Sequence, residues 1–214
     1  FYLYEISGYL GRTVINNFFT GRYHQPRQEE RIFMFLDMKD STQIAEQLGH
    51  IQYFRLLNQY FADLSDAILN TSGAVYQYAG DEIIVTWDLP TGTRNNNCIR
   101  CFFMIKEILH SLSGEYEKAF GLVPQFKAGF HQGEVTTGEI GVLKKEIFFT
   151  GDVINTAARI QSLCNNMGKT ILVSEDLISR LDLSGEFAVF EMGEQELKGK
   201  QSKVKLFTLE PLDP

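Results

Sequence analysis

The sequence predicts an α+β domain in which a mixed β-sheet of ferredoxin-like type carries helices on one face. Two observations support this prediction. β-Rich and helical runs follow one another in the order strand, helix, β-hairpin, helix, hairpin, helix, strand. The first β-rich run, residues 32–36, is continuously apolar, which is typical of a strand covered on both faces. No repeat or second core is visible, so we expect one core domain.

Composition limits the kinds of protein that this chain can be. Its 214 residues carry a formal net charge of −7 and a pI near 5.2. This charge argues against a protein that coats nucleic acid. No apolar run approaches the roughly 18 residues of a membrane span. The chain begins at Phe1 rather than Met. This indicates a piece of a longer protein, with room for membrane spans or a sensor region upstream.

The cysteines indicate a reducing compartment, so we expect a cytoplasmic domain. Three cysteines in a domain of this size do not make a disulfide framework. Cys98 and Cys101 have the C-x-x-C spacing, but they lie in a helical pattern without a second pair. We therefore interpret them as buried thiols rather than as a zinc or redox site.

The first 30 residues are predicted to be a separate N-terminal element. Residues 1–20 have apolar side chains at nearly helical spacing, which predicts an amphipathic helix, and residues 21–30 form a polar linker. The helix either transmits a signal or dimerises, or it packs on its own domain. The predicted organisation is therefore 1–30 for helix and linker, and 31–214 for the core domain.

The middle of the chain is predicted to form helices around a β-hairpin. Residues 44–69 have helical periodicity with a break at Gly49, which predicts one long helix or two in tandem. A hairpin then has its tip at Gly80 and Asp81. The other elements predicted here are strands at 74–78 and 83–87, a helix at 98–112 and a strand near 125–132.

The last third is predicted to be β-rich and to contain one long helix. Gly133, Gly138 and Gly141 indicate hairpin turns. Gly168 is expected to close a helix that begins after Asp152. The elements predicted here are strands near 134–140, 145–149, 170–173, 187–191 and 204–209, a helix at 153–167 and a short helix after residue 174.

The end of the first strand is a candidate metal and phosphate site. Asp37 follows the apolar run, and Asp40, Ser41 and Thr42 supply residues that start helices. Asp37 would meet Asp81 if their strands are neighbours, and two carboxylates beside a helix start suit a two-metal phosphate site. The alternative is that Asp37 merely caps a turn.

Five segments together resemble one family. The segments FLDMKDST, QYAGDE, FHQG, GDVINTAAR and ELKGK are similar to the catalytic domain of class III nucleotidyl cyclases, in the correct order over residues 31–209. The resemblance implies a head-to-tail homodimer with its sites at the subunit interface. It also implies conversion of a nucleoside triphosphate to its 3′,5′-cyclic monophosphate and pyrophosphate, with two Mg²⁺ or Mn²⁺ ions per site.

The resemblance also assigns roles to residues. Asp37 and Asp81 match the metal-binding aspartates. From the other subunit, Asn155 matches the residue that orients the ribose and Arg159 the one that stabilises the transition state. Lys198 lies where the family often places a triphosphate-contacting lysine. The backbone of the phosphate-binding turn is matched by Met38, Lys39, Asp40, Ser41 and Thr42.

This chain departs from the family at the positions that read the base. Gln77 occupies the position where the family usually has a lysine. Phe148 occupies the position where it usually has an Asp or a Thr. Structural roles also remain open, with Asn155 as a surface amide, Arg159 as half of an ion pair and His131 as a core residue. We therefore expect an adenylate cyclase that uses ATP. The alternatives are a guanylate cyclase that uses GTP, and a catalytically silent module that binds nucleotide or dimerises.

Overall fold

A computed structural model describes residues 24–142, 145–197 and 203–212. The predicted N-terminal helix at 1–20 and the turn that carries Lys198 lie outside the described residues. Both stay predictions.

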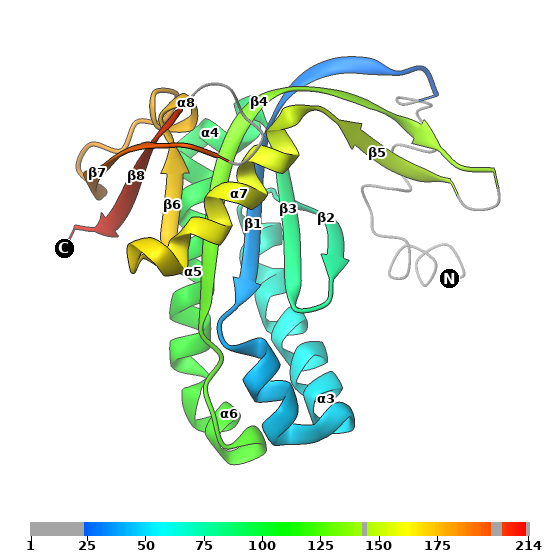
Figure 1. Cartoon of the computed structure of the whole chain (residues 1–214), viewed down its shortest axis with the longest axis vertical. Helices are drawn as coiled ribbons and strands as arrows, with labels where there is room; N and C mark the ends of the chain where they lie inside the picture. Colours follow the sequence, from blue (N-terminus) through cyan, green and yellow to red (C-terminus); the bar gives the residue numbers. More distant parts are fainter. Residues whose placement is uncertain (1–23, 143–144, 198–202, 213–214) are drawn as a thin grey trace.

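The described chain alternates between strands and helices, as predicted, and Figure 1 shows their arrangement. The elements are β1 (Arg27–Met38), α3 (Ser41–Asn70), β2 (Ala74–Ala79), β3 (Glu82–Asp88), α4 (Leu89–Thr93), η1 (Arg94–Asn96), α5 (Asn97–Ser111), α6 (Ser113–Phe120), β4 (Phe126–Ile140), β5 (Glu146–Thr150), α7 (Asp152–Met167), β6 (Ile171–Ser174), α8 (Glu175–Ile178), β7 (Phe187–Gln195) and β8 (Val204–Pro211).

The strands form one mixed sheet with a ferredoxin-like centre. Its order is β2-β3-β1-β4-β6-β8-β7, and β5 pairs with β4 outside this path. The pair β4–β6 is parallel and the other pairs are antiparallel. The segment from β1 to β4 has the βαββαβ connection of the ferredoxin-like motif. The predicted fold class is therefore confirmed.

Helices cover both faces of the sheet, so the expectation of helices on one face was wrong. On one face, Ile32, Met34 and Leu36 of β1 belong to the core cluster that contains residues of α3 and α5. On the other, Phe33 and Phe35 pack in a cluster with residues of α7. Figure 1 shows α7 crossing the sheet on the side opposite to α5. The second layer explains why β1 is apolar without alternation.

The long helix α3 is broken at Gly49, which confirms the predicted break. Gly49 has φ 74° and ψ 162°, outside the helical region. A positive φ costs glycine little because it has no Cβ. The kink turns the first two helical turns, which follow the candidate site, away from the axis of the remainder.

β4 is continuous through Gly133, where a turn had been expected. Its register with β1 runs without interruption from Phe126 to Thr137. A Cβ at Gly133 would lie 2.8 Å from Cγ2 of Val153 on α7. The glycine therefore makes room for a helix that crosses the strand, and it does not end the strand.

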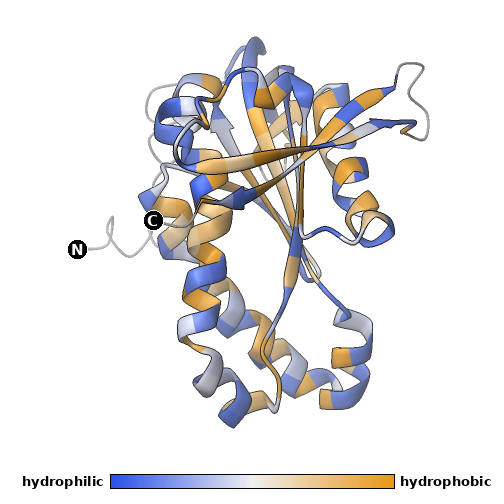
Figure 2. Ribbon diagram, turned by 90° about the vertical axis from the view of Figure 1, so that its left-hand side faces the viewer, coloured by the Kyte–Doolittle hydropathy of each residue, from blue (hydrophilic) through white to orange (hydrophobic). Residues whose placement is uncertain are grey.

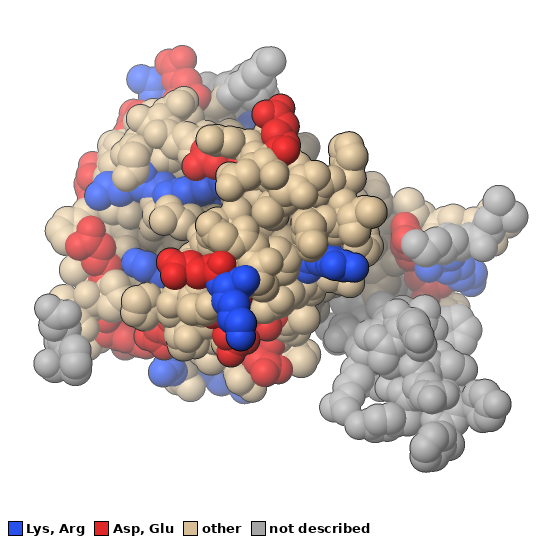
Figure 3. All heavy atoms as spheres, turned by 90° about the horizontal axis from the view of Figure 1, so that it is seen from below, with Lys and Arg blue, Asp and Glu red and all other residues tan. Residues whose placement is uncertain are grey.

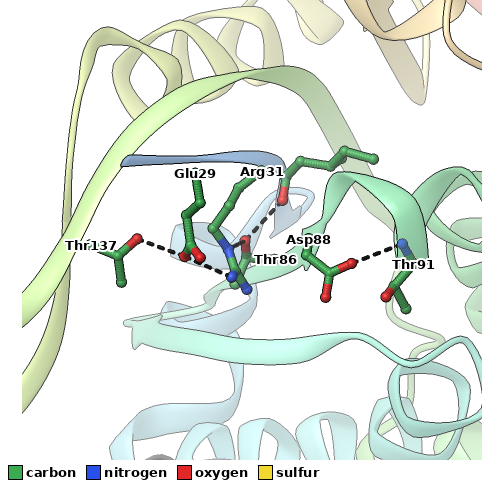
Figure 4. A network of polar contacts seen from close by, with 7 residues as sticks. Glu29, Arg31, Thr86, Asp88, Thr91 and Thr137 are labelled. Atoms are coloured by element: carbon green, nitrogen blue, oxygen red, sulfur yellow. Dashed lines mark hydrogen bonds and ion pairs between the residues drawn. The ribbon is translucent and has the colours of Figure 1, made fainter. Parts of the chain in front are cut away.

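A buried polar network joins β1, β3 and β4 at the end of β1 opposite to Asp37 (Figure 4). Arg31 donates from Nε to the Thr86 hydroxyl (3.1 Å) and from Nη1 to Glu29 (3.0 Å). Thr137 donates to the same Glu29 oxygen (2.7 Å). The guanidinium also lies 4.9 Å from the ring centroid of Phe149. These contacts compensate the buried charges, so the network stabilises the start of β1.

Apolar residues concentrate on the strands and on the inner faces of the helices (Figure 2). Trp87, the single tryptophan of the sequence, is 1% exposed on β3 and donates from Nε1 to the Thr71 carbonyl at 3.0 Å. Gly73 and Gly92 lie so close to its ring that an added Cβ would crowd it. The indole is therefore enclosed in the layer between the sheet and α3.

All three cysteines are buried and free, which confirms the interpretation as core thiols. Burial raises the pKa of Cys101 and of Cys164 to about 12 in each case. Lys and Arg side chains are interspersed with Asp and Glu on the face in Figure 3, without a continuous basic patch. No helix among the described residues is long and apolar enough to cross a membrane.

Candidate active site

The sheet brings Asp37 and Asp81 together, as the sequence suggested it would if their strands were neighbours. β1 pairs with β3, and Asp37 lies opposite Glu82. Asp81 precedes Glu82 in a tight turn in which Gly80 has φ 66°. In addition to burial, the Asp37 carboxyl lies near enough to raise the pKa of Asp81. Two carboxylates therefore meet at one end of the central strands.

Burial and neighbouring negative charge raise the pKa values of Asp81 and Glu82. Burial raises the pKa of Asp81, and the Asp37 carboxyl raises it further, while a hydrogen bond from Ser41 lowers it. Burial, aided by the charges of Asp37 and Asp81, raises the pKa of Glu82 from 4.5 to about 7. The site therefore holds more negative charge than the protein compensates, which is the condition for binding a cation.

The carboxylate oxygens of this site suit a hard cation whose remaining coordination positions are filled by a bound ligand. Oδ2 of Asp81 is buried without a hydrogen-bond partner. In the part of the chain that the structure describes, no three His, Cys, Asp or Glu side chains are arranged to hold one ion. Mg²⁺ is typically held by one or two carboxylates together with substrate phosphates. Asp37 and Asp81 fit this pattern of two carboxylates with a bound phosphate. The described residues do not fit a site in which protein side chains alone surround the ion.

Two further side chains hold Asp37, and neither was predicted from the sequence. Lys127 of β4 places Nζ 3.2 Å from Oδ2 of Asp37, and Gln161 of α7 donates from Nε2 to the same oxygen at 2.8 Å. Lys127 lies directly opposite Asp37 in the β1–β4 register. A lysine within an apolar strand was the available signal, but its partner depends on the register. Nothing in the sequence distinguished Gln161.

The turn after Asp37 leads directly into the start of α3. Asp40 is the N-cap residue of α3, with φ 55° in the left-handed region, but its side chain makes no capping hydrogen bond. The first helical bond runs from Ile44 N to the Asp40 carbonyl at 3.0 Å. The N–H groups of Ser41 and Thr42 thus precede the first helical bond, as at any helix start.

Lys39 donates its N–H to the Gln125 carbonyl at 2.8 Å, and the Met38 side chain is 2% exposed in the core. The side chain of Met38 therefore cannot reach a ligand bound at the turn, and only its backbone could contribute.

Asn155 and Arg159 share α7 but do not contact the carboxylate pair in the described contacts. Asn155 is exposed. Nη1 of Arg159 is buried without a hydrogen-bond partner, and its ion pair with Asp152 is long, at 3.9 Å. The alternative role of Arg159 as half of an ion pair is thus only weakly realised. The guanidinium retains donors for another group.

The two residues at the base-reading positions lie on segments that meet. Tyr76, beside Gln77 on β2, has its ring centroid 4.9 Å from that of Phe149, beside Phe148 on β5. Gln77 is exposed, and Phe148 is 40% exposed. Both side chains are thus available at the surface of one chain. His131, by contrast, is 5% exposed and lies 2.8 Å from the Ser174 hydroxyl, as a core residue would.

Close packing against Gly129 fixes the position of α7. A Cβ at this residue of β4 would lie 2.6 Å from Cα of Gln161 and 2.7 Å from the carbonyl oxygen of Ala157. Helix and strand therefore approach to a separation that only glycine allows. This packing sets how far Gln161, Asn155 and Arg159 stand from the sheet.

The chain belongs to the family of adenylate and guanylate cyclase catalytic domains, whose model matches residues 23–211. It is 35% identical over 208 residues to adenylate cyclase 2 of Rhizobium meliloti (strain 1021), with 97% of this chain and 57% of that protein covered. It is 31% identical over 170 residues to bovine retinal guanylyl cyclase 2, with 78% of this chain and 15% of that protein covered. The chain thus spans little more than half of the first relative.

The fold agrees with this family. A bacterial light-regulated adenylyl cyclase superposes with a TM-score of 0.84 at 21% sequence identity, with 97% of this chain and 60% of that chain covered. At this identity the likeness concerns the fold alone.

Proposed function

We propose that this chain is the catalytic domain of an adenylate cyclase, which converts ATP to 3′,5′-cyclic AMP and pyrophosphate. One observation carries the proposal: the sheet holds Asp37 and Asp81 together beside an exposed helix start, although burial and mutual repulsion raise the pKa of Asp81. A module that only dimerises has no physical need for this arrangement. The active site is expected to be composite, with two copies of the chain contributing.

Asp37 and Asp81 are proposed to hold two Mg²⁺ or Mn²⁺ ions, because cyclases of this family generally use divalent metals. Such ions lower the pKa of the 3′-hydroxyl group and neutralise phosphate charge. The turn from Met38 to Thr42 is proposed to bind the phosphates through its N–H groups at the start of α3, because the N–H of Lys39 already donates to the Gln125 carbonyl. Lys198 is proposed to contact the triphosphate as well.

The second chain is proposed to complete the site from its own α7. Asn155 would orient the ribose, and Arg159 would donate its free guanidinium hydrogens to the charge that develops on the α-phosphate. The lack of a hydrogen-bond partner at Nη1 of Arg159 supports this role, since a guanidinium committed to a close internal ion pair would be less available. No protein side chain is required as the base.

ATP is proposed as the preferred substrate because of Gln77 and Phe148. A glutamine amide can match adenine or guanine by turning over, so Gln77 does not choose. Phe148 is 40% exposed in one chain, and we expect the second chain to cover it. In the dry pocket that results, Phe148 offers no hydrogen bond to the 2-amino group of guanine, and a polar group left buried and unpaired costs about 1–3 kcal/mol. We therefore expect a preference for ATP of about 10- to 100-fold.

The decisive assay incubates the pure protein with ATP or GTP and either Mn²⁺ or Mg²⁺, and measures cyclic product. Competing kcat/KM values then determine the base preference. GTP used as well as ATP would contradict the adenylate assignment. A folded dimer that binds nucleotide and forms neither product would favour the silent module.

A further inference from the structure

Gln161 is a buried amide whose recorded hydrogen bond goes to a candidate metal ligand. Its side chain is 6% exposed, and Nε2 lies 2.8 Å from Oδ2 of Asp37. A buried amide without a partner would cost free energy, and a hydrogen bond to a charged acceptor is stronger than one to a neutral acceptor. The contact between α7 and the end of β1 is therefore specific.

The backbone that carries this amide is held in place. The Cα of Gln161 packs directly over Gly129, where no side chain could be accommodated. Because the root of the side chain is fixed, the amide approaches Asp37 from a defined direction. Preorganised hydrogen bonds of this kind orient metal ligands in other proteins.

Lys127 contacts the same oxygen but cannot replace this function. Its ammonium group lies 3.2 Å from Oδ2 of Asp37 and supplies positive charge. An ammonium has three rotatable donors on a flexible stem, so it compensates charge without setting direction. The Gln161 amide is uncharged and planar, so it can fix the rotation of the carboxylate without competing electrostatically with a cation.

We propose that Gln161 is a positioning residue for the metal site, which holds the Asp37 carboxylate in the rotation that accepts the divalent cation. This inference rests on the proposed function, because that proposal places the cation at Asp37 and Asp81. Gln161 is not itself a ligand. It acts through Asp37, and it makes the metal affinity of one chain depend on the placement of its own α7.

The test is Gln161→Met, which keeps the length and approximate volume of the side chain and removes the donor. Gln132→Met is the matched control. Gln132 is also a buried glutamine, 8% exposed, and its Nε2 donates to the Asp176 carbonyl at 3.2 Å, away from Asp37. The binding of Mn²⁺ alone to the full chain is titrated by calorimetry and by the increase in melting temperature.

The expected result is a dissociation constant for Mn²⁺ about tenfold higher in Gln161→Met, within the 10- to 100-fold range typical when a partner of a metal ligand is removed. Gln132→Met should stay within twofold of wild type. The Mn²⁺ concentration for half-maximal activity should rise in parallel in Gln161→Met, while kcat at saturating Mn²⁺ stays within about threefold. A purely structural role would instead lower the metal-free melting temperature and leave Mn²⁺ affinity unchanged.

Mn²⁺ affinity within twofold of wild type in Gln161→Met overturns the inference and leaves the proposed function standing. An equal loss in Gln132→Met also overturns it. A wild-type chain that binds no Mn²⁺, either alone or together with an ATP analogue that cannot be cyclised, overturns both the inference and the proposed metal site. If Gln161→Met does not fold, Gln161→Leu replaces it, because it also removes the donor without adding a charge, and it is expected to weaken Mn²⁺ binding by about the same factor.

Discussion

Two carboxyl groups where β3 begins, beside the end of β1, lower the stability of the metal-free protein. Asp81 and Glu82 both have raised pKa values, because burial and neighbouring negative charge disfavour their ionised forms. Functional sites often retain such unfavourable groups because a ligand compensates them. Replacing either residue by its neutral amide therefore separates stability from function.

Asp81→Asn should abolish cyclase activity, by at least about 100-fold, while the metal-free protein melts at the same or a higher temperature. The amide removes a metal ligand and also the repulsion from Asp37. Activity assays and circular dichroism in the presence of a chelator measure the two effects. Asp66→Asn, at an exposed position of α3, is the control and should change neither. Full activity of Asp81→Asn would refute the metal assignment.

Glu82→Gln should stabilise the metal-free protein at alkaline pH. The pKa of Glu82 is about 7 in the fold against an ordinary 4.5, so the folded state keeps a proton that the unfolded state releases. Raising the pH through this interval therefore favours unfolding, and the effect is complete above pH 7. For a half-exposed carboxyl, we expect the glutamine variant to gain about 1 kcal/mol at pH 8, and about a quarter of that at pH 5.

Urea denaturation at both pH values, with a chelator present, measures this difference. Glu107→Gln changes an exposed glutamate of α5 and should show no dependence on pH. An equal gain for Glu82→Gln at pH 5 and pH 8 would show that the effect is not electrostatic.

Two residues of this site, Asp37 and Asp81, were predicted from the sequence because they lie where strands end or begin. Two others, Lys127 and Gln161, were not predicted, because their positions depend on tertiary packing. Asp37 and Asp81 follow apolar β-rich runs, so local pattern was enough to place them. Lys127 and Gln161 reach Asp37 only because β1 pairs with β4 and because α7 crosses the sheet. Register and helix docking are tertiary properties that neither residue's surroundings in the sequence reveal.

At the scale of elements, α7 is the helix on which the site depends most. It contributes Gln161 to the carboxylates of its own chain, and it carries Asn155 and Arg159, which are proposed to act in the site of another. Its distance from the sheet is set by Gly129. A small displacement of this helix should therefore affect metal binding and catalysis together.

Gly129→Ala should destabilise the fold by about 2–3 kcal/mol, because the new methyl group meets backbone atoms of α7 that cannot rotate away. It should also reduce activity under conditions in which the protein is still folded. Gly114→Ala, at an exposed position of α6, is the matched control, since nothing lies within 4 Å of a Cβ added there. It should stabilise by up to about 1 kcal/mol. A Gly129→Ala protein as stable as wild type would contradict the close packing of α7.

Glycines also show why some elements were predicted and others were not. Gly49 and Gly168 have positive φ and interrupt or end helices, as their positions in a helical pattern indicated. Gly133 was expected to mark a turn in the same way. It lies in a continuous strand instead, because α7 needs space there. A glycine required for conformation and one required for space are identical in sequence, so only the packing distinguishes them.

At the scale of the whole molecule, the described chain separates the two halves of the proposed chemistry. The carboxylate pair lies at the end of β1, and no described contact joins it to Asn155 or Arg159. A head-to-tail dimer would unite the halves from different copies. The arrangement within one chain is consistent with such a dimer, and a mixing experiment can test it.

Asp37→Ala and Arg159→Ala should each be inactive alone, and activity should return when they are mixed. With free exchange of subunits at equal amounts, half of the dimers are mixed and each has one intact site, so about one quarter of wild-type activity is expected. Asp37→Ala mixed with Asp81→Asn is the control. It should stay inactive, because every site then lacks a carboxylate. If mass spectrometry shows exchange and the first mixture remains inactive, the shared site is wrong.

The enclosure of Trp87 gives this protein a built-in optical reporter. A single indole that is 1% exposed and hydrogen-bonded to a backbone carbonyl should emit at short wavelength in the folded protein and shift to the red when water reaches it. Because Trp87 lies in the layer between the sheet and α3, its emission follows that layer, while circular dichroism also follows α7. Unfolding curves from the two signals that coincide would show that the two helical layers melt as one cooperative unit. A circular-dichroism transition that begins before the fluorescence transition would show that α7 detaches first.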